Sequence, residues 1–135
     1  MRFRFKYNDG GRAQYHSNDR RQSDCVLRAL SIYFNEDYEV MYQKMRDIIG
    51  RKKYKYYRGV NDDDLEKLMK ELGFEFHPIN PPRNLNTISF SCRKFIVDSK
   101  KHLSTIINGV IYDTYDIQED AETNIISGYY THNNY

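Results

Sequence analysis

The chain has 135 residues, and 21 Lys and Arg against 19 Asp and Glu give it a formal net charge of +2. This length allows one domain, residues 1–135, with a sizeable core, and the small net charge gives no argument for a polyanionic partner. No apolar run reaches the ~20 residues of a membrane span. Because the two cysteines are far apart, with no CxxC motif and no secretory leader after Met1, we expect reduced thiols in the cytoplasm.

The N-terminal part of the chain predicts a strand, a loop and a helix. Residues 2–7 alternate between basic and aromatic types, a period of two that is typical of a half-buried strand. The polar stretch 12–22 has no period, so we expect a loop in which His16 is exposed rather than a ligand or a base. Ser23 can cap a helix over 24–34, whose apolar stripe at helical spacing consists of Val26, Leu27, Leu30 and Phe34.

Cys25 falls in the first turn of this predicted helix. Free backbone N–H groups and the positive end of the helix dipole favour a thiolate at that position. Taken alone, an unpaired cysteine is more often a small buried hydrophobe. We interpret Cys92 in that way, and we single out Cys25 because of residues that follow later in the chain.

Two further helices are predicted in the middle of the chain. One covers 38–49 and is stopped by Gly50, with methionines as core filler. The other follows the N-cap residue Asn61 and ends before Gly73. The aspartates at 62–64 lie in its first turn, where they serve the helix dipole rather than a metal. We therefore expect neither a metal nor a cofactor.

A basic and aromatic run, residues 51–58, lies between these two helices. Basic residues interleaved with aromatic ones can grip phosphates and stack on bases. The candidate nucleic-acid or surface-binding residues of this run are Lys52, Lys53, Lys55 and Arg58. One short run without a recognised nucleic-acid fold is more often a solvated connection, so a nucleic-acid partner is the minor alternative.

The second half of the chain predicts strands. Phe74 to His77 is expected to be a short strand that Pro78 ends, and 94–98 is expected to be another. Residues 84–93 leave helix and strand both open. A last strand is predicted over 125–131.

A β-hairpin is the strongest pattern in this half of the chain. Two β-branched apolar runs flank Asn108-Gly109, the dipeptide best suited to a type I′ turn because both central residues need a positive φ. A two-residue loop fixes the register of the pairing and sets Ile107 opposite Val110.

This register predicts a catalytic constellation. His102 and Asp113 become diagonal neighbours on one face of the hairpin, and a histidine beside a carboxylate is an oriented base. Cys25 is the thiol that this base can deprotonate, which suits nucleophilic acyl transfer. The Cys25 backbone N–H can bind the oxyanion, with Gln22 or Asn18 as candidate second donors.

The arrangement of these residues resembles known proteins. Cys on the N-terminal helix, then His and Asp on neighbouring strands, is similar to the papain-like cysteine peptidases, in the compact style of the peptidase C39-like domains. Small phage and prophage proteins are similar over about residues 7–130, through NDGGR at 8–12, DCVLRAL at 24–30, YEVMY at 38–42, GV at 59–60, His102 and NGVIYDT at 108–114. The resemblance implies an α+β papain-like fold, in which N-terminal helices pack on a C-terminal antiparallel sheet, and a phage-encoded protein in the host cytoplasm.

The chain departs from the papain-like pattern at two positions. Such enzymes usually have Gly after the nucleophile and Gln about six residues before it, where this chain has Val26 and Asp19. Amidase, deamidase and acyltransferase activities therefore stay open beside hydrolysis of a peptide or isopeptide bond. The alternative is a catalytically weak or inactive papain-like protein that acts by binding a host factor. In either case we expect a protein or peptide partner and no membrane.

Overall fold

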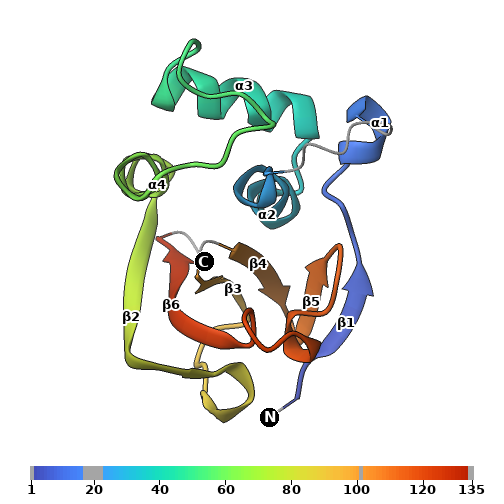
Figure 1. Ribbon diagram of the computed structural model, residues 1–135, viewed down its shortest axis with the longest axis vertical. Helices are drawn as coiled ribbons and strands as arrows, with labels where there is room; N and C mark the ends of the chain where they lie inside the picture. Colours follow the sequence, from blue (N-terminus) through green and yellow to red (C-terminus); the bar gives the residue numbers. More distant parts are fainter. Residues whose placement is uncertain (1, 17–22, 101, 134–135) are drawn as a thin grey trace.

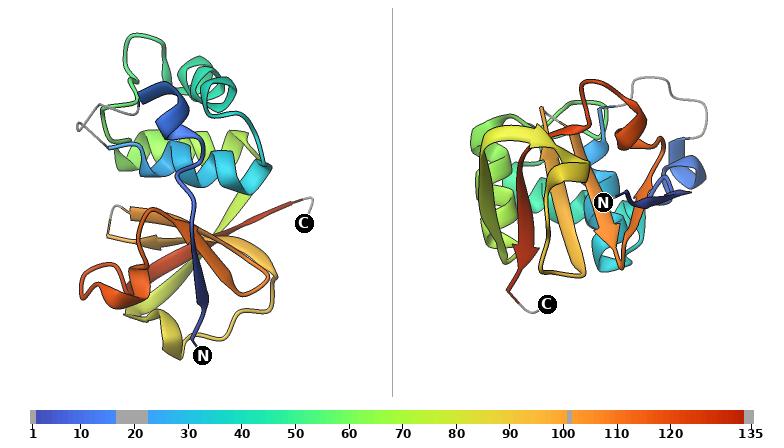
Figure 2. Two further views of the ribbon diagram at one scale, coloured as in Figure 1. Left: turned by 90° about the vertical axis from the view of Figure 1, so that its right-hand side faces the viewer. Right: turned by 90° about the horizontal axis from the view of Figure 1, so that it is seen from below.

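The computed structural model describes residues 2–16, 23–100 and 102–133. Its helices lie on one face of a single sheet, as an upper layer in Figure 1 and in the left view of Figure 2. The helices are α1 (Arg12–His16), α2 (Cys25–Phe34), α3 (Tyr38–Ile49) and α4 (Asp62–Glu71). The strands are β1 (Arg4–Tyr7), β2 (Phe74–Asn84), β3 (Lys94–Ser99), β4 (His102–Ile107), β5 (Val110–Asp113) and β6 (Ile125–His132).

The sheet is mixed, with the strand order β1-β5-β4-β3-β6-β2. Every neighbouring pair is antiparallel except β1 with β5, which is parallel. The predicted α+β class, with N-terminal helices packed on a sheet, is therefore confirmed. The sheet is mostly rather than entirely antiparallel, and it includes the N-terminal strand β1. The N-terminal strand joins the edge of the sheet beside β5, where the amide N–H of Arg4 donates to the carbonyl of Gly109 at 3.0 Å.

The β4–β5 hairpin forms in the predicted register. Ile107 pairs with Val110, and Thr105 pairs with Tyr112. The two turn residues between the strands, at 108 and 109, have φ values of 50° and 80°, as a type I′ turn requires. The local chemistry of the turn thus settles which side chains share a face.

The helices largely follow the predicted boundaries. α3 covers the residues expected of it, and Asp37 caps it by accepting hydrogen bonds from two backbone N–H groups. α4 begins after Asn61, whose side chain accepts from the N–H of Asp64 at 2.8 Å. α2 begins one residue later than predicted, at Cys25. Asp24 precedes it without making a side-chain cap, because its carboxylate is buried among other partners.

Three predictions about the edges of the sheet and the N-terminal loop are wrong. All four residues of β1 are exposed rather than half-buried, because this strand lies at one edge of the sheet. Residues 12–16 form the short helix α1 instead of a loop. β2 does not stop at Pro78 but continues to Asn84 with a shift in register. It can do so because it is the other edge strand, where a missing N–H need not interrupt a ladder.

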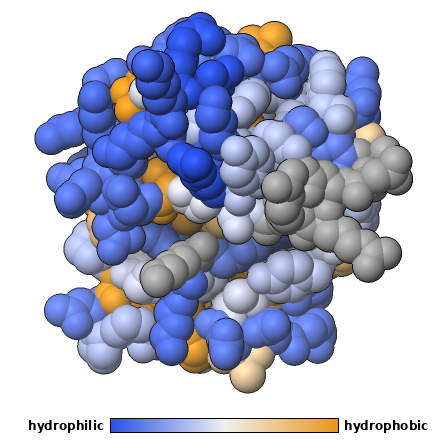
Figure 3. Space-filling view, turned by 45° about the horizontal axis from the view of Figure 1, so that its top comes forward, coloured by the Kyte–Doolittle hydropathy of each residue, from blue (hydrophilic) through white to orange (hydrophobic). Residues whose placement is uncertain are grey.

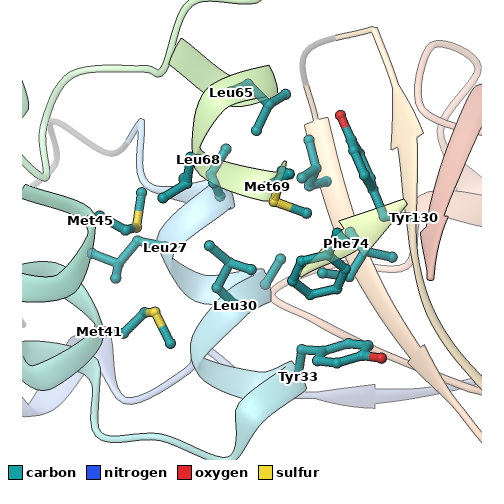
Figure 4. Close-up of a cluster of buried hydrophobic side chains, with 14 of the residues drawn as sticks. Leu27, Leu30, Tyr33, Met41, Met45, Leu65, Leu68, Met69, Phe74 and Tyr130 are labelled. Atoms are coloured by element: carbon teal, nitrogen blue, oxygen red, sulfur yellow. The ribbon is translucent and has the colours of Figure 1, made fainter. Parts of the chain in front are cut away.

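Two hydrophobic cores lie on the two faces of the sheet. The first core joins α2, α3 and α4 to the sheet through fully buried side chains such as Leu27, Leu30 and Met45 (Figure 4). The second core lies on the opposite face and consists of Phe3, Leu85, Ile88, Phe95, Val97, Ile106, Ile111, Ile117 and Ile126. The face shown in Figure 3 is mostly hydrophilic, with apolar residues in small patches. Among the described residues, no helix has the length and apolar character needed to cross a membrane.

Candidate active site

A cavity of about 840 Å³ lies between the helices and the end of the β4–β5 hairpin. Cys25 and His102 both line it, although they are far apart in the sequence. The other lining residues come mainly from α1, α2, α4, β3 and the segment after β5, and they include Arg12, Arg28, Asp62, Leu65, Asp98, Thr114 and Tyr115. The fold therefore brings the predicted nucleophile and the predicted base into one cavity.

Cys25 is the first residue of α2 and is partly buried. Cys25 packs against the first core, to which its neighbour Val26 belongs, and both residues also border the cavity. The hydroxyl of Thr105 in β4 donates to the carbonyl of Ala29 at 2.7 Å. This bond ties α2 to the same strand that carries His102.

The imidazole of His102 is bound by the carboxylate of Asp113. The distance between Nε2 and Oδ2 is 2.7 Å, and the predicted diagonal contact across the hairpin is therefore present. Asp113 is 4% exposed. It also accepts hydrogen bonds from the Ser104 hydroxyl and from the Thr114 N–H, the latter at 2.6 Å. Its carboxylate is thus held in place from three sides.

The electrostatics of this pair favour the ionised forms of both groups. Burial disfavours a charged imidazole, but hydrogen bonds and Coulombic attraction from Asp113 and Cys25 raise the pKa of His102 to about 9. Burial also opposes the charge on Asp113, yet hydrogen bonds from His102, Ser104 and Thr114 and the attraction of His102 lower its pKa. At neutral pH His102 therefore carries its proton, and it lies beside both the carboxylate of Asp113 and the sulfur of Cys25.

A buried ionic network, which the sequence analysis did not identify, fixes the start of α2. Asp24 is 1% exposed and accepts from the Tyr38 hydroxyl at 2.7 Å. It lies 3.3 Å from Arg12 and 3.2 Å from Arg28. Arg28 also donates to the Thr114 hydroxyl at 2.9 Å, which connects α2 to the residue after Asp113. The Asp24–Arg28 spacing of four residues on a helix was the signal available in the sequence.

Arg12 and Arg28 also line the cavity that holds Cys25. Two guanidinium groups balanced by one buried carboxylate leave this end of the cavity positively charged. Such a site stabilises negative charge that develops on a bound group. Among the described residues, no group of three or more His, Cys, Asp and Glu side chains could hold a metal ion.

The other predicted residues lie elsewhere. Cys92 lines a separate cavity of about 350 Å³ with Phe3, Phe90 and Phe95, and burial raises the pKa of its thiol. Neither cysteine forms a disulfide bond. The candidate oxyanion donors Gln22 and Asn18 lie outside the described residues. His16 is not an exposed loop residue, because it is partly buried and its ring stacks on Tyr56 with centroids 3.7 Å apart.

The aromatic residues of the basic run are turned toward the protein. Tyr54 is 2% exposed and belongs to the first core, and Tyr56 packs against the same core. The Lys53 ammonium lies 2.8 Å from the Asp64 carboxylate. Lys52 and Arg58 are exposed, and Lys55 is partly exposed. The basic side chains are thus accessible, but the rings beside them contribute mainly to packing.

The chain was compared with protein-family models, with curated proteins and with solved structures. No family model matches it, and no curated protein or solved structure gives a significant match.

Proposed function

We propose that this chain is a cysteine-dependent hydrolase with a papain-like fold, which cleaves a peptide, isopeptide or amide bond. The observation that carries the proposal is the cavity shared by Cys25 and His102, in which Asp113 binds the far side of the imidazole. An activated nucleophile needs these three parts: a thiol, a base beside it, and a group that orients the base. Following the resemblance to phage and prophage proteins, we take the substrate to be a protein or peptide in the host cytoplasm.

The proposed reaction has two halves: Cys25 is first acylated, and the thioester is then hydrolysed. Asp113 binds Nε2 of His102, so Nδ1 is the ring nitrogen left for the thiol. The sulfur of Cys25 attacks the carbonyl carbon of the scissile bond while His102 holds the thiol proton. The C–N bond then breaks, His102 gives that proton to the departing amine, and a thioester remains on Cys25. Water attacks the thioester carbon while His102 accepts a proton from it. The C–S bond then breaks, the carboxylic acid leaves, and His102 returns that proton to the sulfur of Cys25.

Two features of the cavity would stabilise the oxyanion in this reaction. The backbone N–H of Cys25 is at the start of α2, and the first N–H groups of a helix have no acceptor within the helix. Arg12 and Arg28 add positive charge to the same cavity. Gln22 and Asn18 stay candidate second donors by their position before the nucleophile.

The rate of alkylation by iodoacetamide at different pH values tests the proposed pair. In a Cys92→Ala chain, Cys25 is the remaining thiol, and we expect it to react at about pH 6 at least tenfold faster than an ordinary thiol. Adding His102→Ala should remove this advantage, because the thiol then has no imidazole to take its proton and the thiolate has no imidazolium beside it. The Cys25→Ala chain is the matched control. It reports on Cys92 alone, whose partly buried thiol has a raised pKa and should react slowly until the pH is high.

A second readout follows the covalent step itself. With p-nitrophenyl acetate as the probe, an acetyl group should accumulate on Cys25 and be detectable by mass spectrometry, but not in the His102→Ala chain. If Cys25 reacts slowly in both assays and His102→Ala changes nothing, the hydrolase proposal fails. The alternative, a papain-like protein that acts by binding a host factor, would then be favoured.

A further inference from the structure

A second cavity, of about 1020 Å³, adjoins the cavity that holds Cys25. Asp62, Leu65 and Asp98 line both cavities, so the two adjoin along these three residues. The second cavity runs along α4 toward β2 and β6, and we call it the α4–β6 groove. Its remaining lining residues are Glu66, Met69, Lys70, Phe74, Glu75, Phe76, Lys100, Ser127, Tyr130 and Asn133.

The floor of the α4–β6 groove is apolar. Figure 4 shows Leu65 and Met69 on α4, with Phe74 and Tyr130 beside them on β2 and β6. Met69, Phe74 and Tyr130 also belong to the first core, so the floor is a rigid surface rather than a set of mobile side chains. Phe76 continues the floor outward, with its ring centroid 4.9 Å from that of Tyr130. Phe76 is 44% exposed, so its ring extends the apolar floor to the solvent.

The rim of the α4–β6 groove is acidic, although the whole chain is weakly basic. Four carboxylates line the groove (Asp62, Glu66, Glu75 and Asp98) against two ammonium groups (Lys70 and Lys100). The local charge of the lining is thus −2, whereas the chain carries +2. Burial and the nearby Asp62 raise the pKa of Asp98 to about 6, as expected where carboxylates gather without enough positive charge. A ligand that brings positive charge would relieve this repulsion.

We propose that the α4–β6 groove binds an extended polypeptide segment in which basic side chains alternate with apolar ones. The apolar side chains lie on the aromatic floor, and the basic side chains meet the carboxylates of the rim. The segment continues past Asp62, Leu65 and Asp98 into the cavity of Cys25, where the bond to be cleaved lies. This inference rests on the proposed hydrolase for the step at Cys25, but binding in the groove does not require that step.

Binding is tested first on the full chain carrying Cys25→Ala, so that no turnover interferes. The probe is a short fluorescein-labelled peptide of alternating Leu and Lys, compared by fluorescence polarisation with a Leu and Glu peptide of equal length. We expect the basic peptide to bind about tenfold or more tightly than the acidic one. Replacing exposed rim carboxylates, in a Glu66→Gln and Glu75→Gln double variant, should weaken its binding severalfold. The matched control is Glu122→Gln, an exposed carboxylate that does not line the groove.

A second measurement connects the groove to Cys25. In the Cys92→Ala chain, the Leu and Lys peptide at a concentration near its Kd should slow the alkylation of Cys25, and the Glu66→Gln and Glu75→Gln changes should largely restore the rate. If the peptide binds but Cys25 proves unreactive, the groove stands and the hydrolase fails. If Cys25 is reactive but the basic peptide binds no better than the acidic one, the groove inference is overturned. It is also overturned if that peptide binds the Glu66→Gln and Glu75→Gln double variant as tightly as the parent chain.

Discussion

His102 shows how neighbouring groups can outweigh burial at a single residue. Burial alone would favour the neutral imidazole, yet the bonds and charges of Asp113 and Cys25 raise its pKa to about 9. Its proton therefore stabilises the contact between α2 and the β4–β5 hairpin, as well as serving any chemistry at Cys25. Because of this double role, the free energy of unfolding should depend on the protonation of His102 and therefore on pH.

The free energy of unfolding should fall with pH because of His102. The folded pKa, about 9, lies above the ordinary value of 6.5. The stabilisation is therefore complete below about pH 6.5 and is lost as the pH rises through about 9. We expect the free energy of unfolding to fall by up to about 3 kcal/mol across this window. Urea unfolding at a series of pH values measures it.

The control for this pH dependence is the same series on a His102→Gln chain. Glutamine cannot be protonated, so the slope between about pH 6.5 and pH 9 should become much smaller. An equal slope in both chains would mean that the protonation of another group dominates.

At the scale of elements, the start of α2 is held on two sides. The turn before α1 packs against the backbone of Arg28, and the side chain of Arg28 reaches Thr114 after β5. Since Cys25 is one turn before Arg28, these contacts determine where the thiol lies relative to the hairpin. Changes at either contact should affect both stability and the reactivity of Cys25.

Gly10 should be intolerant of even the smallest side chain. Its φ is +69°, and an added Cβ would lie 3.0 Å from the carbonyl oxygen of Arg28. We expect Gly10→Ala to lower the free energy of unfolding by about 1–3 kcal/mol, because a strained backbone and a close contact combine. Gly59→Ala is the matched control, since nothing lies within 4 Å of its added Cβ. Thermal unfolding compares them, and equal melting temperatures would contradict the packing role of Gly10.

Arg28 should contribute to stability far more than a surface arginine does. Arg28→Met removes the bond to Thr114 and one of the cations beside the buried Asp24, so we expect a loss of about 3 kcal/mol in the free energy of unfolding. Arg51→Met is the control, because Arg51 and Asp47 form an exposed pair whose loss costs less than about 1 kcal/mol. Urea unfolding measures both variants.

The same variants separate a positioning role of Arg28 from a purely structural one. At a temperature where Arg28→Met is fully folded, alkylation of Cys25 at about pH 6 should be slower than in the parent chain. Methionine keeps most of the packing volume but cannot bond Thr114. An unchanged alkylation rate would leave Arg28 with a role in stability alone.

At the scale of the whole molecule, the sheet couples two cores. Consecutive residues of β3 alternate between them, with Phe95 and Val97 in the second core and Ile96 in the first. A change in one core must therefore disturb the strands that support the other. The hairpin that carries His102 contributes to both cores, through Leu103 on one face and Ile106 on the other.

Phe3 should be essential to this shared stability although it precedes the edge strand β1. It is 7% exposed and lies in the second core, with its N–H bound to the side chain of Gln118 at 2.7 Å. We expect Phe3→Ala to lower the free energy of unfolding by about 3 kcal/mol or more. Unfolding followed by circular dichroism and by tyrosine fluorescence should still coincide, because the cores melt together. Two separate transitions would show that the cores are independent.

The hairpin, α3 and α4 could be predicted from the sequence, because local chemistry specifies them. The hairpin register followed from a turn whose two central residues need positive φ, and α3 and α4 followed from their caps and apolar spacing. The contact between His102 and Asp113 was a consequence of that register, so it too was predictable. The shared cavity of Cys25 and His102 was expected from the residue types and the resemblance, and it depends on how α2 packs.

Features that depend on contacts between distant residues became visible only in the folded structure. β1 pairs in parallel with β5, β2 continues past its prolines because it lies at an edge, and His16 stacks on Tyr56. The buried network around Asp24 and the α4–β6 groove likewise join residues from several elements. Local propensity acts over a few residues, whereas burial and ion pairing are settled by which elements the whole fold brings together.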